Sequence, residues 1–301
     1  MDIKSVYFVE VGPRDGFQNV KEYIPLEKKL HIIDMLIQSG VKSMELTSFV
    51  HPKAIPQMKD SHDVVIKTLE KHGSSDVDFF ALVPNLFGAK AAAECGLTKI
   101  DTVISVSESH NKANINRTVS ESLEGLTAIR QELPDMEIIL SLATSFTCPF
   151  EGITPIDNVL SIIRKGVDLG IHQFCLADTI GQADPLMVRN TAKAVLKEFP
   201  NEHFELHIHD TRGMGLASTL AGIEAGINSV QAAVGGLGGC PFAPGASGNV
   251  ASEDLIFMLN AMNIHTGIDF QKMLDTALYE TTIISGNYSG HQIHINTPCS
   301  N

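Results

Sequence analysis

Two histidines separated by one residue, His207 and His209, have a spacing that suggests a metal site. Side chains alternate across a β-strand, so two such rings on one strand point to the same face. Neutral imidazoles about 7 Å apart along a strand can occupy neighbouring positions around one ion. The chain holds 12 histidines, so the alternative is a pair that arose by chance. We predict a metal site because acidic residues are expected beside the pair.

The remaining ligands are expected from two loops far apart in the sequence. Asp15 follows the first predicted strand, and Asn249 lies at the end of a glycine-rich loop. Two imidazoles, one carboxylate and one amide oxygen form a mixed shell that suits Mg²⁺ or Mn²⁺ and leaves Zn²⁺ open. The alternative for Asp15 is a turn-forming role before Gly16.

Three more charged residues are expected at the same strand ends. Arg14 offers a planar fork of donors to a developing oxyanion, unless it forms only a surface ion pair. Glu45 lies in an otherwise apolar strand, where an unpaired carboxylate is costly, so Arg14 is its expected partner. Asp178 directly follows another predicted strand.

Cys240 lies in the glycine-rich loop that begins at Gly235. Such a loop is a poor core element and a good mobile lid, so we predict a chemical role for this thiol. The alternative is a small buried apolar residue, as we expect for Cys95 and Cys175. The five cysteines are odd in number and contain no CxxC pair, which indicates a reduced, cytoplasmic chain.

Short apolar runs alternate with amphipathic helical patterns along nearly the whole chain. Alternating strands and helices imply a parallel sheet, and eight units fit a closed (β/α)8 TIM barrel, whose active site lies at the carboxyl ends of its strands. An open doubly wound sheet is the alternative. The eight predicted strands are 6–11, 43–47, 78–82, 102–107, 137–143, 173–177, 204–209 and 229–234.

Four glycines precede alternate predicted strands, each followed by an aliphatic residue: Gly40, Gly96, Gly170 and Gly226. Each is typical of a helix end that continues through a tight loop into a strand. Beyond the last strand we expect a helix from Ser252 to Met262, then an apolar helical stripe over 270–278. We predict a single domain over 1–301, with the barrel at about 6–250, C-terminal helices at about 251–284 and a mobile tail over 285–301.

The net charge of the chain disfavours two classes of binding partner. The 301 residues include 22 Lys and Arg against 35 Asp and Glu, a net charge of −13. This disfavours nucleic acid and anionic membrane surfaces, both of which attract basic chains. No apolar run approaches the roughly 20 residues of a membrane helix, and the amino end shows no signal-peptide pattern. We therefore expect no nucleic-acid or membrane partner.

Four segments together resemble the 3-hydroxy-3-methylglutaryl-CoA lyase family of metal-dependent barrel lyases. They are VGPRDGFQN (11–19), MELTSFVHPK (44–53), HIHDTRG (207–213) and GGLGGCPFAPGASGN (235–249). The cysteine loop is the most specific of the four, because the condensing relatives of this family lack it.

The resemblance implies a role for each matching residue. Asp15, His207, His209 and Asn249 match the ligands of the divalent cation, and Arg14 matches the arginine that stabilises an enolate. Glu45 and Asp178 match acidic residues of the pocket, Cys240 matches a lid cysteine that transfers a proton, and Lys21 aligns with a lysine near the CoA-binding entrance. The family also implies an acyl-CoA thioester substrate, leucine degradation and a homo-oligomer, with a dimer favoured.

The implied reaction is a retro-Claisen cleavage that yields acetyl-CoA and acetoacetate. Asp15 is the first choice for the base, and a ligand histidine or metal-bound water is the alternative. Ala177, Thr147 and Met214-Gly215 depart from the family's usual residues and leave the acyl group open, for example to citramalyl-CoA. We favour a lyase over a condensing acyltransferase and over a non-catalytic metal-binding barrel.

Overall fold

The computed structural model describes residues 3–239 and 248–295, and its centre is a closed barrel of eight parallel strands. The barrel strands are β1 (Tyr7–Glu10), β2 (Ser43–Ser48), β3 (Asp78–Leu82), β4 (Lys99–Ser105), β5 (Glu137–Ala143), β8 (Gln173–Ala177), β9 (His203–His207) and β10 (Ser229–Ala232). Around the barrel they follow the order β1-β10-β9-β8-β5-β4-β3-β2, so the first and last strands close it. The predicted TIM barrel is confirmed.

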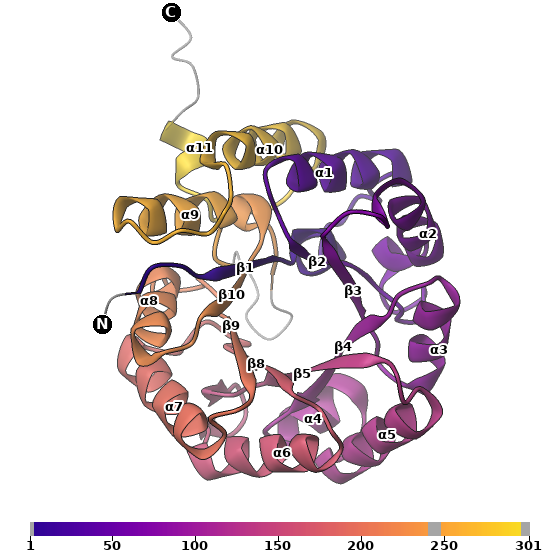
Figure 1. Cartoon of the computed structure of the whole chain (residues 1–301), viewed down its shortest axis with the longest axis vertical. Coiled ribbons are helices and arrows are strands. Elements are labelled where there is room, and N and C mark those ends of the chain that lie inside the picture. The colour runs from indigo at the N-terminus through magenta and orange to yellow at the C-terminus, as the bar shows by residue number, and fades with distance from the viewer. Residues whose placement is uncertain (1–2, 240–247, 296–301) are drawn as a thin grey trace, which may run out of the picture.

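Helices form a ring around the barrel, and three more lie outside it on the side of β1 (Figure 1). The ring helices are α1 (Leu26–Gln38), α2 (Ser61–His72), α3 (Leu86–Glu94), α4 (Glu108–Ile115), α5 (Val119–Glu132), α6 (Ile156–Asp168), α7 (Pro185–Glu198) and α8 (Gly215–Ala225). The outer helices are α9 (Ser252–Ala261), α10 (Phe270–Ile283) and α11 (Gln292–Ile295). The short elements are η1 (Gly12–Gly16), η2 (Pro56–Met58), η3 (Val234–Gly236) and the hairpin β6 (Thr147–Cys148) with β7 (Gly152–Ile153).

The four predicted helix-ending glycines all adopt left-handed backbone angles. Their φ values are +104° for Gly40, +96° for Gly96, +70° for Gly170 and +117° for Gly226. Residues with a Cβ rarely adopt such angles, so glycine allows the chain to turn sharply from helix into strand. At Gly40 a Cβ would also lie 2.7 Å from the carbonyl oxygen of Gly267, which makes glycine doubly necessary there.

Three strands match their predicted bounds, and the others differ by a few residues. The difference that matters most for the site is at the ends of β9 and β10. These strands end at His207 and Ala232, whereas the predicted strands end at His209 and Val234. The reason is a third segment: His209 forms an isolated bridge with Asn249, and Ala233 forms one with Ala251. The β6–β7 hairpin was not predicted, because two-residue strands carry no periodic pattern.

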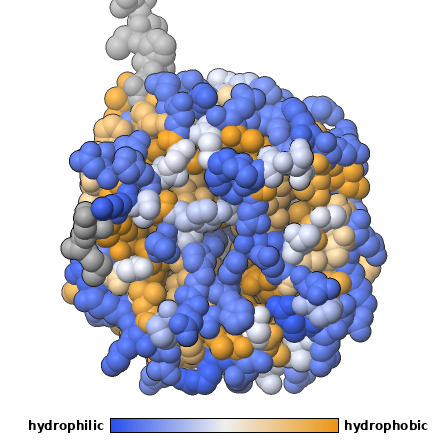
Figure 2. Space-filling view, in the orientation of Figure 1, coloured by the Kyte–Doolittle hydropathy of each residue, from blue (hydrophilic) through white to orange (hydrophobic). Residues whose placement is uncertain are grey.

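The apolar core lies mainly between the barrel and its helices, and a small second cluster fills the barrel interior. That inner cluster consists of Val9, Val11, Phe80, Ile139, Cys175 and Ala233. On the face in Figure 2, apolar residues are scattered among hydrophilic ones. Within residues 3–239 and 248–295, no helix is both long and apolar enough to cross a membrane.

The sequence predicts a mobile tail over residues 285–301, but in the structure residues 285–295 pack against η3. Gly290 N–H donates to Gly235 O at 3.1 Å, and Ser289 Oγ donates to Asn249 O at 2.9 Å. A Cβ on Gly290 would lie 2.2 Å from a carboxylate oxygen of Glu253, so this glycine permits close packing. A composition rich in Ser, Asn, Gly and His predicts mobility, whereas in the structure the small residues among them allow close contact. Residues 296–301 lie outside the described part.

Candidate active site

The turn after β1 holds two of the predicted residues, Arg14 and Asp15. Gly12 begins this turn because the Glu10 side chain folds back to accept its N–H at 2.8 Å, and a Cβ would lie 2.7 Å from that oxygen. Pro13 fixes the next backbone angle, and Asp15 N–H closes the turn on Val11 O at 2.7 Å. The η1 turn therefore presents Arg14 and Asp15 side by side, both buried.

The two histidines meet Asp15 at the carboxyl end of β9. The Nε2 atoms of His207 and His209 lie 3.0 Å apart. Asp15 Oδ2 lies 3.9 Å from Nε2 of His207 and 4.0 Å from Nε2 of His209. The ligand atoms of these three buried residues all lie within 4.8 Å of one another, which forms an Asp/His group able to hold a metal ion. The predicted shared face of the histidine pair is present.

Asn249 joins this group from the far end of the sequence. Its Nδ2 donates to Asp15 Oδ2 at 2.7 Å and to Leu237 O at 3.2 Å. Its backbone is held beside β9, because Val250 N–H donates to Ile208 O at 3.3 Å. Within the described residues the buried Oδ1 atom of Asn249 accepts no hydrogen bond. An unpaired buried oxygen beside a carboxylate and two imidazoles fits a ligand of a divalent cation.

Arg14 connects the metal-site candidates to Glu45. Its Nε donates to Glu45 Oε2 at 2.7 Å, and its Nη1 donates to Asp15 Oδ1. Glu45 is 1% exposed and Arg14 is 9% exposed, so both charges are largely removed from water. The ion pair expected from the sequence is present, and the guanidinium spans two carboxylates as only a planar fork can.

The pKa values of the site residues are shifted from their usual values by burial and by neighbouring charges. Burial alone would raise the pKa of Asp15, but Arg14 and the two histidines lower it to about 2. Burial, together with the neighbouring His207, lowers the pKa of His209 to about 4. Burial also lowers the pKa of His207. Near neutral pH the group therefore offers a carboxylate and two neutral imidazoles, which are the forms that bind metals.

The pKa of Glu45 shifts in the opposite direction from that of Asp15. Burial, with the nearby carboxyl of Asp101, raises the pKa of Glu45 to about 8 against the opposing effect of Arg14. Burial likewise raises the pKa of Asp101 to about 6. Three carboxyl groups thus share the charge of Arg14, and Asp15 is the one whose pKa is lowered. Carboxyl groups with pKa values pushed apart in this way are typical of acid–base sites.

Asp178 lies directly after β8 and is 1% exposed. Its two oxygens accept N–H groups from Gln182 and Ala183, each at 3.1 Å. Burial raises its pKa, and His209 is close enough to oppose the shift. The structure therefore places Asp178 at the same end of the barrel, beside His209.

One predicted residue, Lys21, is not part of this group. Lys21 is exposed in the segment between η1 and α1 and takes no part in the contacts above. Cys240 lies outside the described residues, so its position is not given. The loop that carries it begins at η3, where Gly235 N–H donates to Glu253 Oε2 at 2.9 Å.

Sequence reasoning missed three polar residues that contact the site directly or through one neighbour. Gln18 donates to Asp15 Oδ1 at 2.5 Å, and Gln231 lies 3.0 Å from Nδ1 of His207. Gln231 also donates to Glu205, which is 3% exposed. The signal was present for Glu205, because it lies two residues before His207 and therefore on the same strand face.

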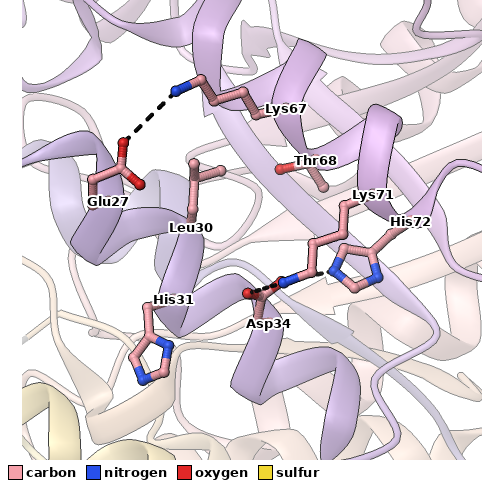
Figure 3. Close-up of a pocket in the computed structure, with 8 residues that line it drawn as sticks. All are labelled: Glu27, Leu30, His31, Asp34, Lys67, Thr68, Lys71 and His72. Carbon is pink, nitrogen blue, oxygen red and sulfur yellow. Dashed lines mark hydrogen bonds and ion pairs between the residues drawn. The ribbon is translucent and has the colours of Figure 1, made fainter.

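A pocket of about 330 Å³ lies outside the barrel, between α1 and α2 (Figure 3). Its charged side chains pair with one another: Asp34 contacts Lys71 at 2.5 Å and His72 at 2.7 Å, and Lys67 lies 3.7 Å from Glu27. Pairs that remain accessible to solvent contribute little to stability, and here they leave no uncompensated charge for a ligand. This pocket shares no residue with the strand-end group.

Known proteins match nearly the whole chain. The HMGL-like family profile matches residues 5–279. The hydroxymethylglutaryl-CoA lyase YngG of Bacillus subtilis is 41% identical over 276 residues, which cover 91% of each chain. A crystal structure of a B. subtilis HMG-CoA lyase has a TM-score of 0.92 at 38% identity and covers 98% of this chain and 99% of that one.

A second solved structure carries ligands. It is an HMG-CoA lyase from Acinetobacter baumannii in complex with coenzyme A and 3-methylmalate. Its TM-score is 0.92 at 36% identity, and the match covers 99% of this chain and 97% of that one. Together with the family profile, these similarities over nine-tenths of the sequence identify the chain as a member of the HMGL-like family.

Proposed function

We propose that this protein is a hydroxymethylglutaryl-CoA lyase, a carbon–carbon lyase that cleaves 3-hydroxy-3-methylglutaryl-CoA to acetyl-CoA and acetoacetate. The observation that carries the proposal is the group of Asp15, His207 and His209 next to the Arg14–Glu45 ion pair at one barrel end. The relatives that bear this name match almost the full length of the chain. The bound coenzyme A in the A. baumannii relative supports an acyl-CoA substrate.

We propose Asp15, His207, His209 and the Oδ1 atom of Asn249 as the residues that hold a divalent cation, with Mg²⁺ or Mn²⁺ preferred. A bound divalent ion supplies Lewis acidity, which lowers the pKa of a substrate hydroxyl. The unpaired oxygen of Asn249 and the two facing Nε2 atoms support this assignment. None of these four proposed ligands is a soft thiolate, which disfavours copper.

In the proposed reaction the base removes the proton of the C3 hydroxyl. The C2–C3 bond then breaks, its electron pair passes to C2 as the acetyl-CoA enolate, and C3 becomes the ketone of acetoacetate. Asp15 is the proposed base, although its pKa of about 2 makes it a weak one that depends on an acidified hydroxyl. Arg14 stabilises the enolate oxygen through the guanidinium that also holds Glu45.

Two further roles belong to the same proposal. Cys240, assigned from the sequence alone, donates the proton that converts the enolate carbon into the methyl group of acetyl-CoA. Asp178 is held rigidly by backbone N–H groups and acts as an acidic neighbour of His209. Lys21 is exposed, as a contact to the charged part of CoA requires.

A thioester related to HMG-CoA is the second candidate substrate. The A. baumannii relative is in complex with 3-methylmalate, a branched hydroxy acid, as well as with coenzyme A. A lyase acting on citramalyl-CoA would release pyruvate where an HMG-CoA lyase releases acetoacetate. The two activities therefore differ in a product that is easily measured.

Steady-state assays with Mg²⁺ or Mn²⁺ and a panel of hydroxyacyl-CoA thioesters test the proposal. We expect the highest kcat/KM for HMG-CoA, with equal amounts of acetyl-CoA and acetoacetate. Asp15→Asn removes the proposed ligand charge and should abolish Mn²⁺ binding and turnover together. Asp34→Asn, in the outer α1–α2 pocket, is the matched control and should leave both unchanged. Preferred release of pyruvate, or turnover that survives Asp15→Asn, would contradict the proposal.

A further inference from the structure

A chain of hydrogen bonds lies directly beneath the candidate metal site, inside the barrel. Glu205 and His207 lie two residues apart on β9, so both side chains point to the same face. Gln231 lies on β10 opposite His207 in the parallel register. Gln231 Nε2 donates to Glu205 Oε2 at 2.9 Å, and Gln231 Oε1 lies 3.0 Å from His207 Nδ1. None of the three residues is more than 8% exposed.

The orientation of the Gln231 side-chain amide, which Glu205 holds, determines the direction of the hydrogen bonds in this chain. Its NH₂ group donates to Glu205, so the oxygen of the amide points the other way. The oxygen of the same amide then faces His207 and can only accept a proton from Nδ1. His207 therefore carries its proton on Nδ1 and its lone pair on Nε2. That Nε2 atom is the one that lies 3.9 Å from Asp15 Oδ2.

We propose that Gln231 and Glu205 are positioning residues, which hold His207 in the tautomer that can bind a metal ion through Nε2. A neutral imidazole has one lone pair, and a proton on Nε2 would block ligation. Partners of the second nitrogen of a metal-binding histidine typically alter metal affinity by about 10- to 100-fold. The inference rests on the proposed function only in placing a divalent cation at this group.

His209 lacks such a constraint. Its Nδ1 atom is buried and forms no hydrogen bond within the described part of the chain. Because His207 Nε2 carries a lone pair, the 3.0 Å contact between the two Nε2 atoms requires His209 to donate. In the metal-free protein one histidine is therefore preset for an ion, and the other must move its proton from Nε2 to Nδ1 to become a ligand.

A purely structural role makes a different prediction. Burial alone requires hydrogen-bond partners for Glu205 and Gln231, whatever the state of His207. Under that explanation the loss of the amide would lower stability and leave the histidine tautomer unchanged. Under the proposal the tautomer itself changes, because the acceptor for Nδ1–H disappears.

The test is the protonation pattern of His207 in the metal-free protein, measured by long-range ¹⁵N–¹H NMR on ¹⁵N-histidine-labelled chain. A His207→Gln sample identifies its signals. Wild type should show a proton on Nδ1. Gln231→Met keeps the side-chain length and removes the amide, so signal from the Nε2–H tautomer should appear. Mn²⁺ affinity, measured by calorimetry, should fall by about 10- to 100-fold in the same variant.

Two further variants keep the test decisive. Glu205→Gln preserves shape and hydrogen bonding but lets the amide chain run in either direction, so both His207 tautomers should be populated with a smaller loss of Mn²⁺ affinity. Ser229→Ala is the control: Ser229 lies on β10 opposite Glu205, and its buried hydroxyl forms no hydrogen bond among the described residues. It should leave tautomer and affinity unchanged.

The outcomes separate the inference from the proposed function. A wild-type His207 with its proton on Nε2 would overturn the inference, as would variants at both Gln231 and Glu205 that keep the wild-type tautomer and Mn²⁺ affinity. If no HMG-CoA is cleaved but the tautomer and Mn²⁺ affinity respond as expected, the proposed function fails and the positioning role stands.

Discussion

Replacing Arg14 with lysine separates the charge of this residue from its shape. Arg14 donates through two different nitrogens, from Nε to Glu45 at 2.7 Å and from Nη1 to Asp15. Lysine keeps the positive charge but concentrates its donors on one nitrogen at the end of a flexible chain. Lysine cannot reproduce the planar guanidinium that faces the carboxylates of Glu45 and Asp15, so at least one of these two hydrogen bonds is lost.

The size of the effect follows from which interaction disappears. A hydrogen bond to a charged group contributes about 1.5–3 kcal/mol, and the loss of an oxyanion donor costs about 2.7–4 kcal/mol. The second range corresponds to a decrease in kcat of about 10²- to 10³-fold, which we expect for Arg14→Lys. Mn²⁺ affinity should change little, because Asp15 keeps its hydrogen bonds from Asn249 and Gln18.

The assay compares kcat for HMG-CoA cleavage with Mn²⁺ affinity for the same protein samples. Arg164→Lys is the matched control, because Arg164 forms an exposed ion pair with Glu198 and should be replaceable without effect. A loss in kcat below about tenfold, worth about 1.4 kcal/mol, would remove Arg14 from the chemical step. Parallel losses in kcat and Mn²⁺ affinity would show that Arg14 acts by orienting Asp15.

Three further predictions concern stability and the glycine-rich loop. Burial raises the pKa of Glu253 from 4.5 to about 8, so its protonated form stabilises the fold below pH 4.5, and this contribution is lost as the pH rises through 8. The free energy of unfolding of Glu253→Gln should therefore vary less than that of the wild type between pH 5 and 9, by about 1.4 kcal/mol for each pKa unit. An unchanged pH dependence of thermal unfolding would contradict this explanation. Cys240→Ser should decrease kcat far more than it weakens substrate binding, and thiol-reactive reagents should inactivate the wild type unless substrate is present. If the labelling rate is the same with and without substrate and the serine variant is active, Cys240 is a structural residue. Gly40→Ala should lower the free energy of unfolding by at least about 1–3 kcal/mol, because it adds left-handed strain and a clash with Gly267 O, whereas an unchanged denaturation midpoint would refute that explanation.

The barrel and most of the strand-end group could be predicted because their signals are local. Apolar runs of five to seven residues and the glycines that precede them mark strands, and period-two spacing places His207 and His209 on one face. Polar residues directly after such strands must meet at one end of a barrel. Asp15 and Asn249 could therefore be assigned to one site although 234 residues separate them.

What could not be predicted depends on contacts across the barrel. Gln231 lies in a short strand and carries no motif, and its importance appears only when β10 is placed beside β9. The docking of residues 285–295 likewise depends on carboxylates in α9, such as Asp254, which accepts from His291 N–H at 2.8 Å. Sequence composition describes these residues as polar and small, and only the fold supplies their partners.

The docked C-terminal segment also has a consequence for the order in which the site can form during synthesis. Asp15 is synthesised 234 residues before its partner Asn249, which is held in turn by Ser289 a further 40 residues along the chain. The barrel itself closes only when β10 reaches β1. A nascent chain must therefore carry an open sheet with unpaired edges until β10 is made, and an Asp15 without its partner until Asn249 is made. A chain that terminates before residue 289 therefore lacks one of the contacts that hold Asn249 beside Asp15.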